Sequence, residues 1–184
     1  IIGCTTEGKS SSAQTLLWLN DPQRPGYFID ATSTHMPKID AQAQGVSLAD
    51  IDGDGDLDMV IACQTPPNRL FLNSGDGRFI DATERLGTQL PMETREVHVF
   101  DANGDGYPDL VFFNLTSNNH EWDKDPQTRI FINDGQANFK DETASRLPKH
   151  RFSSWGGTVI DFNEDGYPDL LVSAIEVPGF VGLQ

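Results

Sequence analysis

The sequence predicts an all-β protein made of β-propeller blades of four antiparallel strands, about three blades' worth, as two complete blades and two complementary halves. Two internal repeats lead to this prediction: an acidic segment of nine residues and a second segment containing a Leu/Ile-rich run that ends in asparagine each occur three times. The runs beside them are short and rich in β-branched residues, which favours strands over helices. Four-stranded units that recur about every 50 residues fit propeller blades better than a sandwich.

The acidic loops, as we name the nine-residue segments, span residues 50–58, 101–109 and 161–169 and align without gaps. A short β-type run precedes and follows each loop, at residues 45–49 and 59–62, 97–100 and 110–113, and 158–160 and 170–172. We therefore expect each acidic loop to join two antiparallel strands.

The second repeat covers residues 17–32, 70–83 and 130–143, and each copy has apolar runs on both sides of a turn, which predicts a hairpin. Together the two repeats divide the chain into a flexible N-terminal tether and a repeat region. The predicted parts are the tether at 1–14 and, within 15–184, a half blade at 15–32, blades at 45–84 and 96–143, and a half blade at 157–174.

The spacing of the acidic loops locates an insertion. Successive loops begin 51 and then 60 residues apart, while the distance from Asn73 to Asp101 equals that from Asn133 to Asp161. The nine extra residues therefore lie within residues 115–128, a polar stretch. This stretch is either a binding loop on a rigid scaffold or a surface loop without a role.

The acidic loops have the oxygen chemistry of calcium sites. Calcium takes six to eight oxygen ligands, and a tightly coiled loop offers side chains at positions 1, 3 and 5, a backbone carbonyl at 7 and a further carboxylate at 9. Glycine at position 6 permits the sharp reversal of the chain. We expect three Ca²⁺ sites because the pattern occurs three times; the stricter octahedron of magnesium suits such loops less well.

The predicted ligands share these positions, and Asp56, Tyr107 and Tyr167 contribute their backbone carbonyls. They are Asp50, Asp52, Asp54, Asp56 and Asp58 in the first loop, Asp101, Asn103, Asp105, Tyr107 and Asp109 in the second, and Asp161, Asn163, Asp165, Tyr167 and Asp169 in the third. An EF-hand is excluded because position 12, where that motif has a bidentate glutamate, holds Ile61, Phe112 and Val172.

The charge agrees with cation binding. The chain has 13 Lys+Arg, 28 Asp+Glu and a formal net charge of −15, so phosphate backbones would repel it and nucleic acid is not an expected partner. Ten of the acidic side chains are predicted ligands, and three bound Ca²⁺ would reduce the net charge from −15 to −9. No run of 18 apolar residues occurs, so no transmembrane segment is predicted.

The loop pattern Asp-x-Asp/Asn-x-Asp-Gly-x-x-Asp, together with segments such as Arg69-Leu70-Phe71-Leu72-Asn73, resembles the FG-GAP/VCBS-type repeats of calcium-binding β-propellers, relatives of those in integrin α-subunits. The resemblance covers about residues 15–175. It implies that each acidic loop joins the first two strands of a blade, that its calcium is mainly structural, and that the protein is extracellular or on the cell surface, as many bacterial members are.

The function expected from this reading is non-catalytic: a calcium-binding module for adhesion, for protein or glycan binding, or for assembly. No catalytic residue is predicted, because His35, His98, His120 and His150 fall in no metal-binding or general-base spacing. The alternative is that the chain is part of a carbohydrate-active propeller enzyme such as a polysaccharide lyase, since some propellers with such loops belong to that class.

The two ends of the chain add two expectations. Residues 1–4, Ile-Ile-Gly-Cys, resemble the cleavage box of a bacterial lipoprotein, so Cys4 is either a lipid anchor or a partner of Cys63 in a disulfide. The terminal half blades leave sheet edges unpaired. They predict association as a dimer or a filament through these half blades, unless missing flanking sequence supplies the strands.

Overall fold

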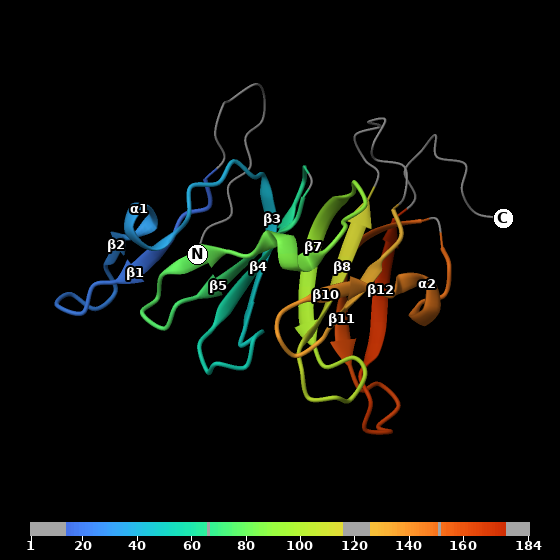
Figure 1. Ribbon diagram of the computed structural model, residues 1–184. Coiled ribbons are helices and arrows are strands. Elements are labelled where there is room, and N and C mark those ends of the chain that lie inside the picture. The colour runs from blue at the N-terminus through green and yellow to red at the C-terminus, as the bar shows by residue number, and fades with distance from the viewer. Residues whose placement is uncertain (1–13, 66, 116–125, 151, 176–184) are drawn as a thin grey trace.

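The computed structural model describes residues 14–65, 67–115, 126–150 and 152–175 of the chain. These residues form twelve strands in four antiparallel sheets, with three single-turn helices, which confirms the all-β fold class (Figure 1). The predicted tether with Cys4, and most of the predicted insertion at 115–128, lie outside the described residues. No helix in the described part of the chain has the length and apolar character needed to cross a membrane.

The sheets follow the sequence repeat. A two-stranded sheet pairs β1 (Trp18–Asn20) with β2 (Phe28–Asp30). The first four-stranded sheet has β3 (Ala43–Ala49), β4 (Asp58–Cys63), β5 (Arg69–Asn73) and β6 (Phe79–Asp81) in sequence order. The second repeats this order with β7 (Glu93–Phe100), β8 (Asp109–Leu115), β9 (Arg129–Asn133) and β10 (Phe139–Asp141). A last pair joins β11 (Ser153–Ile160) to β12 (Asp169–Ile175).

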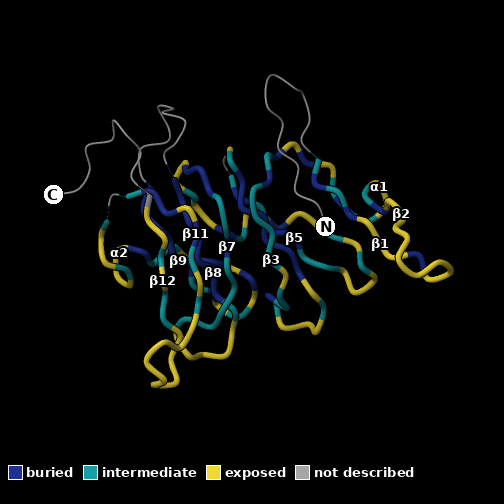
Figure 2. Tube along the Cα trace, turned by 180° about the vertical axis from the view of Figure 1, so that it is seen from behind, coloured by how far each residue is buried: buried dark blue, intermediate teal, exposed yellow. Residues whose placement is uncertain are grey.

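The sheets stand face to face like blades, with their first strands adjacent. Strand β7 packs beside β3 on one side and β11 on the other, as both views show (Figures 1 and 2). Strands β4 and β8 are buried along their whole length. Their apolar residues are therefore continuous rather than alternating, because neighbouring sheets cover both faces of each strand.

The core lies between the sheets. One cluster joins the two four-stranded sheets through residues such as Val60, Leu110 and Phe131, and a T-shaped contact between Phe112 and Phe131 has ring centroids 5.2 Å apart. A second cluster packs β4 and β5 against residues 31–43. Burying such side chains stabilises the fold by about 1.5–3 kcal/mol each, so each blade depends on its neighbour.

Three single-turn helices follow the hairpins, where the sequence analysis expected none. They are α1 (Thr32–His35), the 3-10 helix η1 (Thr83–Leu86) and α2 (Thr143–Arg146). In each, the aspartate two residues earlier accepts a hydrogen bond from the threonine N–H, at 2.9, 3.0 and 3.0 Å. The recurring Asp-x-Thr element is therefore an Asx turn that begins a helical turn, rather than the plain end of a strand.

Cys63 ends β4 and is fully buried. Burial raises the pKa of its thiol to about 12, so this side chain stays protonated and packs as a small apolar group.

Candidate metal centre

The acidic loops join the first and second strands of each unit: β3 to β4, β7 to β8, and β11 to β12. All three lie at the lower edge of the molecule in Figure 1. Because the strand pairs are registered to the ends of the loops, with Ala49 opposite Asp58 and Phe100 opposite Asp109, each loop is held by the same two-stranded base.

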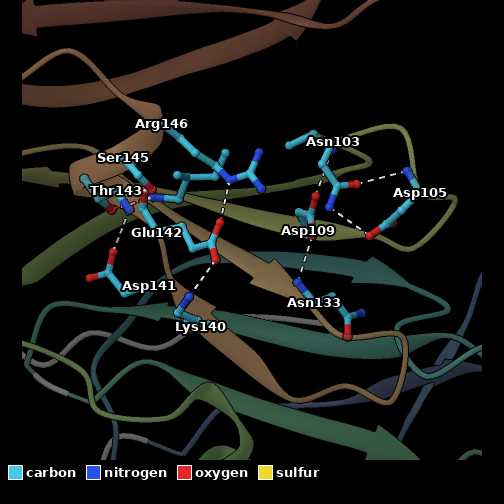
Figure 3. Close-up of polar contacts among 12 residues, drawn as sticks. Asn103, Asp105, Asp109, Asn133, Lys140, Asp141, Glu142, Thr143, Ser145 and Arg146 are labelled. Atoms are coloured by element: carbon cyan, nitrogen blue, oxygen red, sulfur yellow. Dashed lines mark hydrogen bonds and ion pairs between the residues drawn. The ribbon is translucent and has the colours of Figure 1, made fainter.

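The second loop shows how the sequence forms the coil. The Asp101 carboxylate accepts hydrogen bonds from the N–H groups of Gly104 (2.7 Å) and Gly106 (2.9 Å). Asn103 Oδ1 accepts from the Asp105 N–H at 2.9 Å (Figure 3). Asp105 Oδ1 accepts from the Tyr107 N–H, also at 2.9 Å. Positions 1, 3 and 5 thus turn their oxygens toward the inside of the coil through successive Asx turns.

These N–H donors also act on the charge of the first carboxylate. Partial burial alone would raise the pKa of Asp101, but the four backbone N–H groups that point at its carboxylate lower that pKa below its usual value. The carboxylate is therefore held in its charged form, which is the form that binds a cation.

The other two loops repeat this geometry. Asp50 accepts from Gly53 (2.9 Å) and Gly55 (3.1 Å), and Asp161 accepts from Asp165 (3.0 Å) and Gly166 (2.9 Å). The position-5 carboxylates, Asp54 and Asp165, each accept from the position-7 N–H at 2.9 Å. The three loops are therefore three copies of one structure.

Position 4 of the loop requires a left-handed backbone. Gly53 and Gly104 have φ of 79° and 78°, but the third loop has Glu164 at φ 60°. A residue with a side chain is strained there by about 1–2 kcal/mol, so the third loop departs from the pattern at a position where the departure has a cost.

The position-9 carboxylate fixes the loop to the rest of its sheet. Asp109 is fully buried, and its two oxygens accept hydrogen bonds from the N–H groups of Ala102 (2.9 Å) and Asn133 (2.8 Å). Asp58 makes the same pair of bonds, to Ile51 and Asn73, both at 2.8 Å. Burial raises the pKa of both Asp58 and Asp109, although these hydrogen bonds oppose it.

We call these two hydrogen bonds, one from the loop and one from the third strand to the position-9 carboxylate, the clamp. In the third loop the clamp is half formed. Asp169 accepts from the Phe162 N–H at 2.9 Å, and the described residues supply no counterpart of Asn73 or Asn133 for its other oxygen. The missing donor belongs to the third strand of a blade, and the last described sheet has only β11 and β12.

The first loop meets the geometric requirement for calcium. Ligand oxygens of Asp50, Asp52 and Asp58 lie within 4.8 Å of one another. Two oxygens on one Ca²⁺ can be at most about 5 Å apart, since each Ca–O distance is about 2.3–2.6 Å. The donor set consists of carboxylates, which suit this hard cation, so the residues fit the metal.

The other two loops have asparagine at position 3. Asn103 Nδ2 donates to Asp105 Oδ2 at 2.8 Å, and Asn163 Nδ2 donates to Asp165 Oδ2 at 2.9 Å. Each asparagine therefore relieves carboxylate repulsion in a way that Asp52 cannot. Among the described residues the acidic triad of the first loop is not repeated, because these two loops carry one carboxylate fewer.

Three predicted ligands offer backbone carbonyls, and these assignments stay predictions. The side chains of two of them are placed differently: the Tyr107 ring lies against Gly135 in the β9–β10 turn, whereas Tyr167 is 70% exposed. In the first loop Asp56 is half-buried, while Asp54 is exposed.

The asparagine that ends each hairpin strand recurs in the sequence, but its structural role was not predicted. Asn133 Nδ2 donates to the carbonyls of Ile51 (2.9 Å) and Pro108 (3.1 Å), so this side chain joins the bases of two neighbouring loops. Its Oδ1 also accepts from Gly135 and Ala137 in the following turn. Its recurrence with Asn20 and Asn73 was the signal that could have revealed this role.

Comparison with known proteins finds relatives that match most of this chain. The chain is 32% identical over 159 residues to cartilage acidic protein 1 of Xenopus tropicalis, covering 80% of this chain and 23% of the relative. It is 30% identical over 161 residues to cartilage acidic protein 1 of Mus musculus, covering 82% of this chain and 24% of the relative. The chain thus spans less than a quarter of the length of these relatives.

The family comparison includes all three acidic loops. The FG-GAP-like repeat matches residues 50–112 and 116–172, which is well over half of the chain. Such repeats imply a propeller-like fold, which the stacked antiparallel sheets fit. The chain belongs to the FG-GAP-like repeat family.

Proposed function

We propose that the chain is a calcium-stabilised, non-catalytic binding or assembly module that works outside the cell. The observation that carries the proposal is the threefold repetition of one coiled loop, with its oxygens at positions 1, 3 and 5 turned inward. A metal site needs oxygens in a defined arrangement and not negative charge alone. Here the same arrangement occurs three times.

In this proposal three Ca²⁺ ions are bound, one in each acidic loop. Calcium would supply positive charge that holds the carboxylates together, and its role would be structural. The side chains at positions 1, 3, 5 and 9 would bind the ion. The position-9 aspartate would also hold the loop on its sheet through the hydrogen bonds it accepts from two backbone N–H groups.

An extracellular setting is supported by the relatives. Their name, cartilage acidic protein 1, describes an acidic protein of cartilage, and this chain is itself acidic, with a net charge of −15. Calcium is abundant outside cells, where binding sites need only modest affinity.

A role without catalysis is supported by the surroundings of the described histidines, which have three different settings. His98 contacts Glu96 at 2.9 Å, His35 contacts Thr34 at 2.7 Å, and His150 Nε2 accepts from the Thr128 N–H at 3.1 Å. These contacts lie on separate elements, so the three rings do not form one acid–base site. The rival function, a polysaccharide lyase, predicts cleavage of uronic-acid polymers.

Thermal unfolding tests the metal part of the proposal. A ligand that binds the native state stabilises it by about 2.7 kcal/mol per site at a hundredfold excess over Kd. For a domain of this size each occupied site would raise Tm by about 5–10 °C. We expect Tm to fall sharply in excess chelator; curves with chelator and with millimolar calcium that overlay would refute the proposal. Release of unsaturated uronides from acidic polysaccharides would favour the lyase instead.

We also propose that the 184-residue chain, studied on its own, associates through its terminal half blades. The outer face of β12 exposes residues whose counterparts are buried: Leu171 is 67% exposed, while Val60 and Val111 are fully buried. On β1, Trp18 is 44% exposed, while its counterpart Phe71 is fully buried. Both faces therefore resemble blade interfaces that lack their partner.

The half-formed clamp of the third loop indicates how two copies of the chain would meet. Asn20 occupies the position of Asn73 and Asn133, so its N–H group in a second copy matches the free acceptor site of Asp169. Light scattering should show a dimer or a polymer for the full chain and a monomer after deletion of residues 1–32. A calcium-loaded monomer of the full chain would contradict this proposal and leave the calcium proposal intact.

A further inference from the structure

A groove runs along the inner strands, away from the acidic loops. It has a volume of about 670 Å³ and is lined by β3, β7 and by Trp155 of β11, the strands that lie next to one another in Figure 2. Its polar lining residues are Gln44, Ser47, Arg95, Glu96, His98 and Trp155. The volume is within the range of about 300–1,000 Å³ for small-molecule sites.

The sequence repeat places three of these side chains in one row. Gln44, Arg95 and Trp155 each stand six residues before the first aspartate of an acidic loop. Each is the unpaired residue of a β-bulge, at 43/45, 94/96 and 154/156. Bulges re-aim a side chain out of the regular pleat, so the three bulges present a glutamine, an arginine and a tryptophan side by side.

The arginine is held in place from both sides. Arg95 Nη1 donates to Gln44 Oε1 at 2.6 Å, and its guanidinium carbon lies 4.2 Å from the centre of the Trp155 ring. Gln44 is fixed in turn, because its Nε2 donates to Gln64 Oε1 at 2.9 Å. Packing and hydrogen bonds therefore orient the guanidinium before any ligand arrives, which reduces the entropic cost of binding.

The positive charge of Arg95 has no carboxylate partner among the described residues. The nearest acidic residue in sequence, Glu96, is engaged elsewhere: it contacts His98 at 2.9 Å and accepts from the Gly157 N–H at 3.2 Å. Arg95 Nε is buried without a hydrogen-bond acceptor, so a ligand in the groove does not reach it. The other four N–H groups of the guanidinium lie on its two terminal nitrogens, and Gln44 accepts from one of them. These terminal nitrogens therefore retain unused capacity for an anion in a chain that is otherwise strongly acidic.

Trp155 adds an apolar surface beside that charge. Trp155 is 50% exposed, although the guanidinium covers part of its ring. Around it, the Gln44 amide, the Ser47 hydroxyl and the Glu96–His98 pair offer donors and acceptors suited to hydroxyl groups. A cation, an aromatic face and several neutral polar groups in one groove match a ligand that has a carboxylate, an apolar C–H face and hydroxyls.

We propose that this groove binds a carboxylated saccharide, with the sugar carboxylate on Arg95 and a C–H face of the ring on Trp155. Arginine pairs with carboxylates through two parallel hydrogen bonds, which gives both strength and orientation. The inference rests on the proposed function as a binding module and names a ligand class for it. The three bulge residues lie six residues, or about 20 Å of strand, before the acidic loops. The groove is therefore separate from the predicted calcium sites.

The test is calorimetric titration of the calcium-loaded 184-residue chain with digalacturonate, with galactobiose as the neutral disaccharide and succinate as a carboxylate without a sugar. We expect saturable binding of digalacturonate and much weaker binding of the other two. Arg95→Gln should weaken binding at least about tenfold, and Trp155→Leu should also weaken it. Arg78→Gln, which changes an exposed arginine in the β5–β6 turn, should not.

Several outcomes overturn the inference. Absence of digalacturonate binding by a chain that binds calcium and unfolds cooperatively would remove the groove as a saccharide site and leave the proposed function standing. If galactobiose bound as tightly as digalacturonate, Arg95 would not recognise a carboxylate. If succinate bound as tightly, the groove would not recognise a saccharide. An effect of Arg78→Gln as large as that of Arg95→Gln would show attraction by charge alone. Loss of calcium binding in the unaltered chain would instead refute the proposed function.

Discussion

Replacement of Asp109 by alanine should destabilise the chain more than replacement of Asp169, although both hold position 9 of an acidic loop. In Asp109→Ala the N–H of Asn133, a residue that is 2% exposed, loses its acceptor, which costs about 1–3 kcal/mol, and the half-buried N–H of Ala102 loses a bond worth about 1 kcal/mol. In Asp169→Ala one N–H, that of Phe162, loses its acceptor in an exposed setting.

The expected totals are about 2–4 kcal/mol for Asp109→Ala and about 1 kcal/mol or less for Asp169→Ala. The first total should fall toward the lower end, because burial raises the pKa of Asp109 and alanine removes that buried charge. Since both variants lose the same predicted ligand position, their difference reports the clamp rather than the metal.

Thermal unfolding in excess calcium measures this difference. A gap of about 1–3 kcal/mol corresponds to a Tm that is about 2–12 °C lower for Asp109→Ala. Equal losses in the two variants, or a larger loss in Asp169→Ala, would refute the reasoning that the buried N–H of the third strand makes position 9 important.

Three further predictions test other parts of the structure. Glu164→Gly should stabilise the chain by about 0.5–1 kcal/mol in denaturant unfolding, because it relieves a left-handed residue; a loss of stability would contradict this. Gly157→Ala should cost about 1–3 kcal/mol, since a Cβ there lies 2.4 Å from a ring atom of β8 and 2.5 Å from a carbonyl of β12. Gly156→Ala meets the movable tip of a glutamate and should cost less; the reverse order would show that the strands can shift apart. Asp105→Ala should remove one calcium from the measured stoichiometry and Asp76→Ala should remove none, so equal losses would contradict the assignment of ligands.

The repeat made much of the fold predictable. Both hairpins of a blade carry sequence signals that act locally: glycine at the reversal of an acidic loop and aspartate or asparagine in the turns. The strands proved longer than the apolar runs suggested, with β7 beginning at Glu93. Polar residues such as Thr94 and Asn114 extend the ladders, because they hydrogen-bond to each other inside the interface at 2.8 Å.

The features that sequence reasoning missed depend on contacts between distant segments. Asn133 and Ile51 are 82 residues apart, and no local pattern links them. The single helical turns are only four residues long, too short for a helical period to appear. The groove was also missed, although Gln44, Arg95 and Trp155 precede their loops by the same number of residues. Their side chains differ, so only the shared bulge reveals that the positions are equivalent.

The three acidic loops are not equivalent at position 3. The first loop gathers three carboxylates within 4.8 Å, whereas asparagine takes position 3 in the other two. Affinity for calcium rises with the number of charged ligands, so we expect the first loop to bind calcium most tightly.

Calorimetric titration of calcium into the metal-free chain measures how many of the acidic loops bind the ion. We expect saturation at three ions per chain, with the tightest site lost in Asp52→Ala. Binding of no calcium, or a stoichiometry unchanged when a position-1 aspartate such as Asp50 is replaced by alanine, would contradict the claim that the three acidic loops are structural calcium sites.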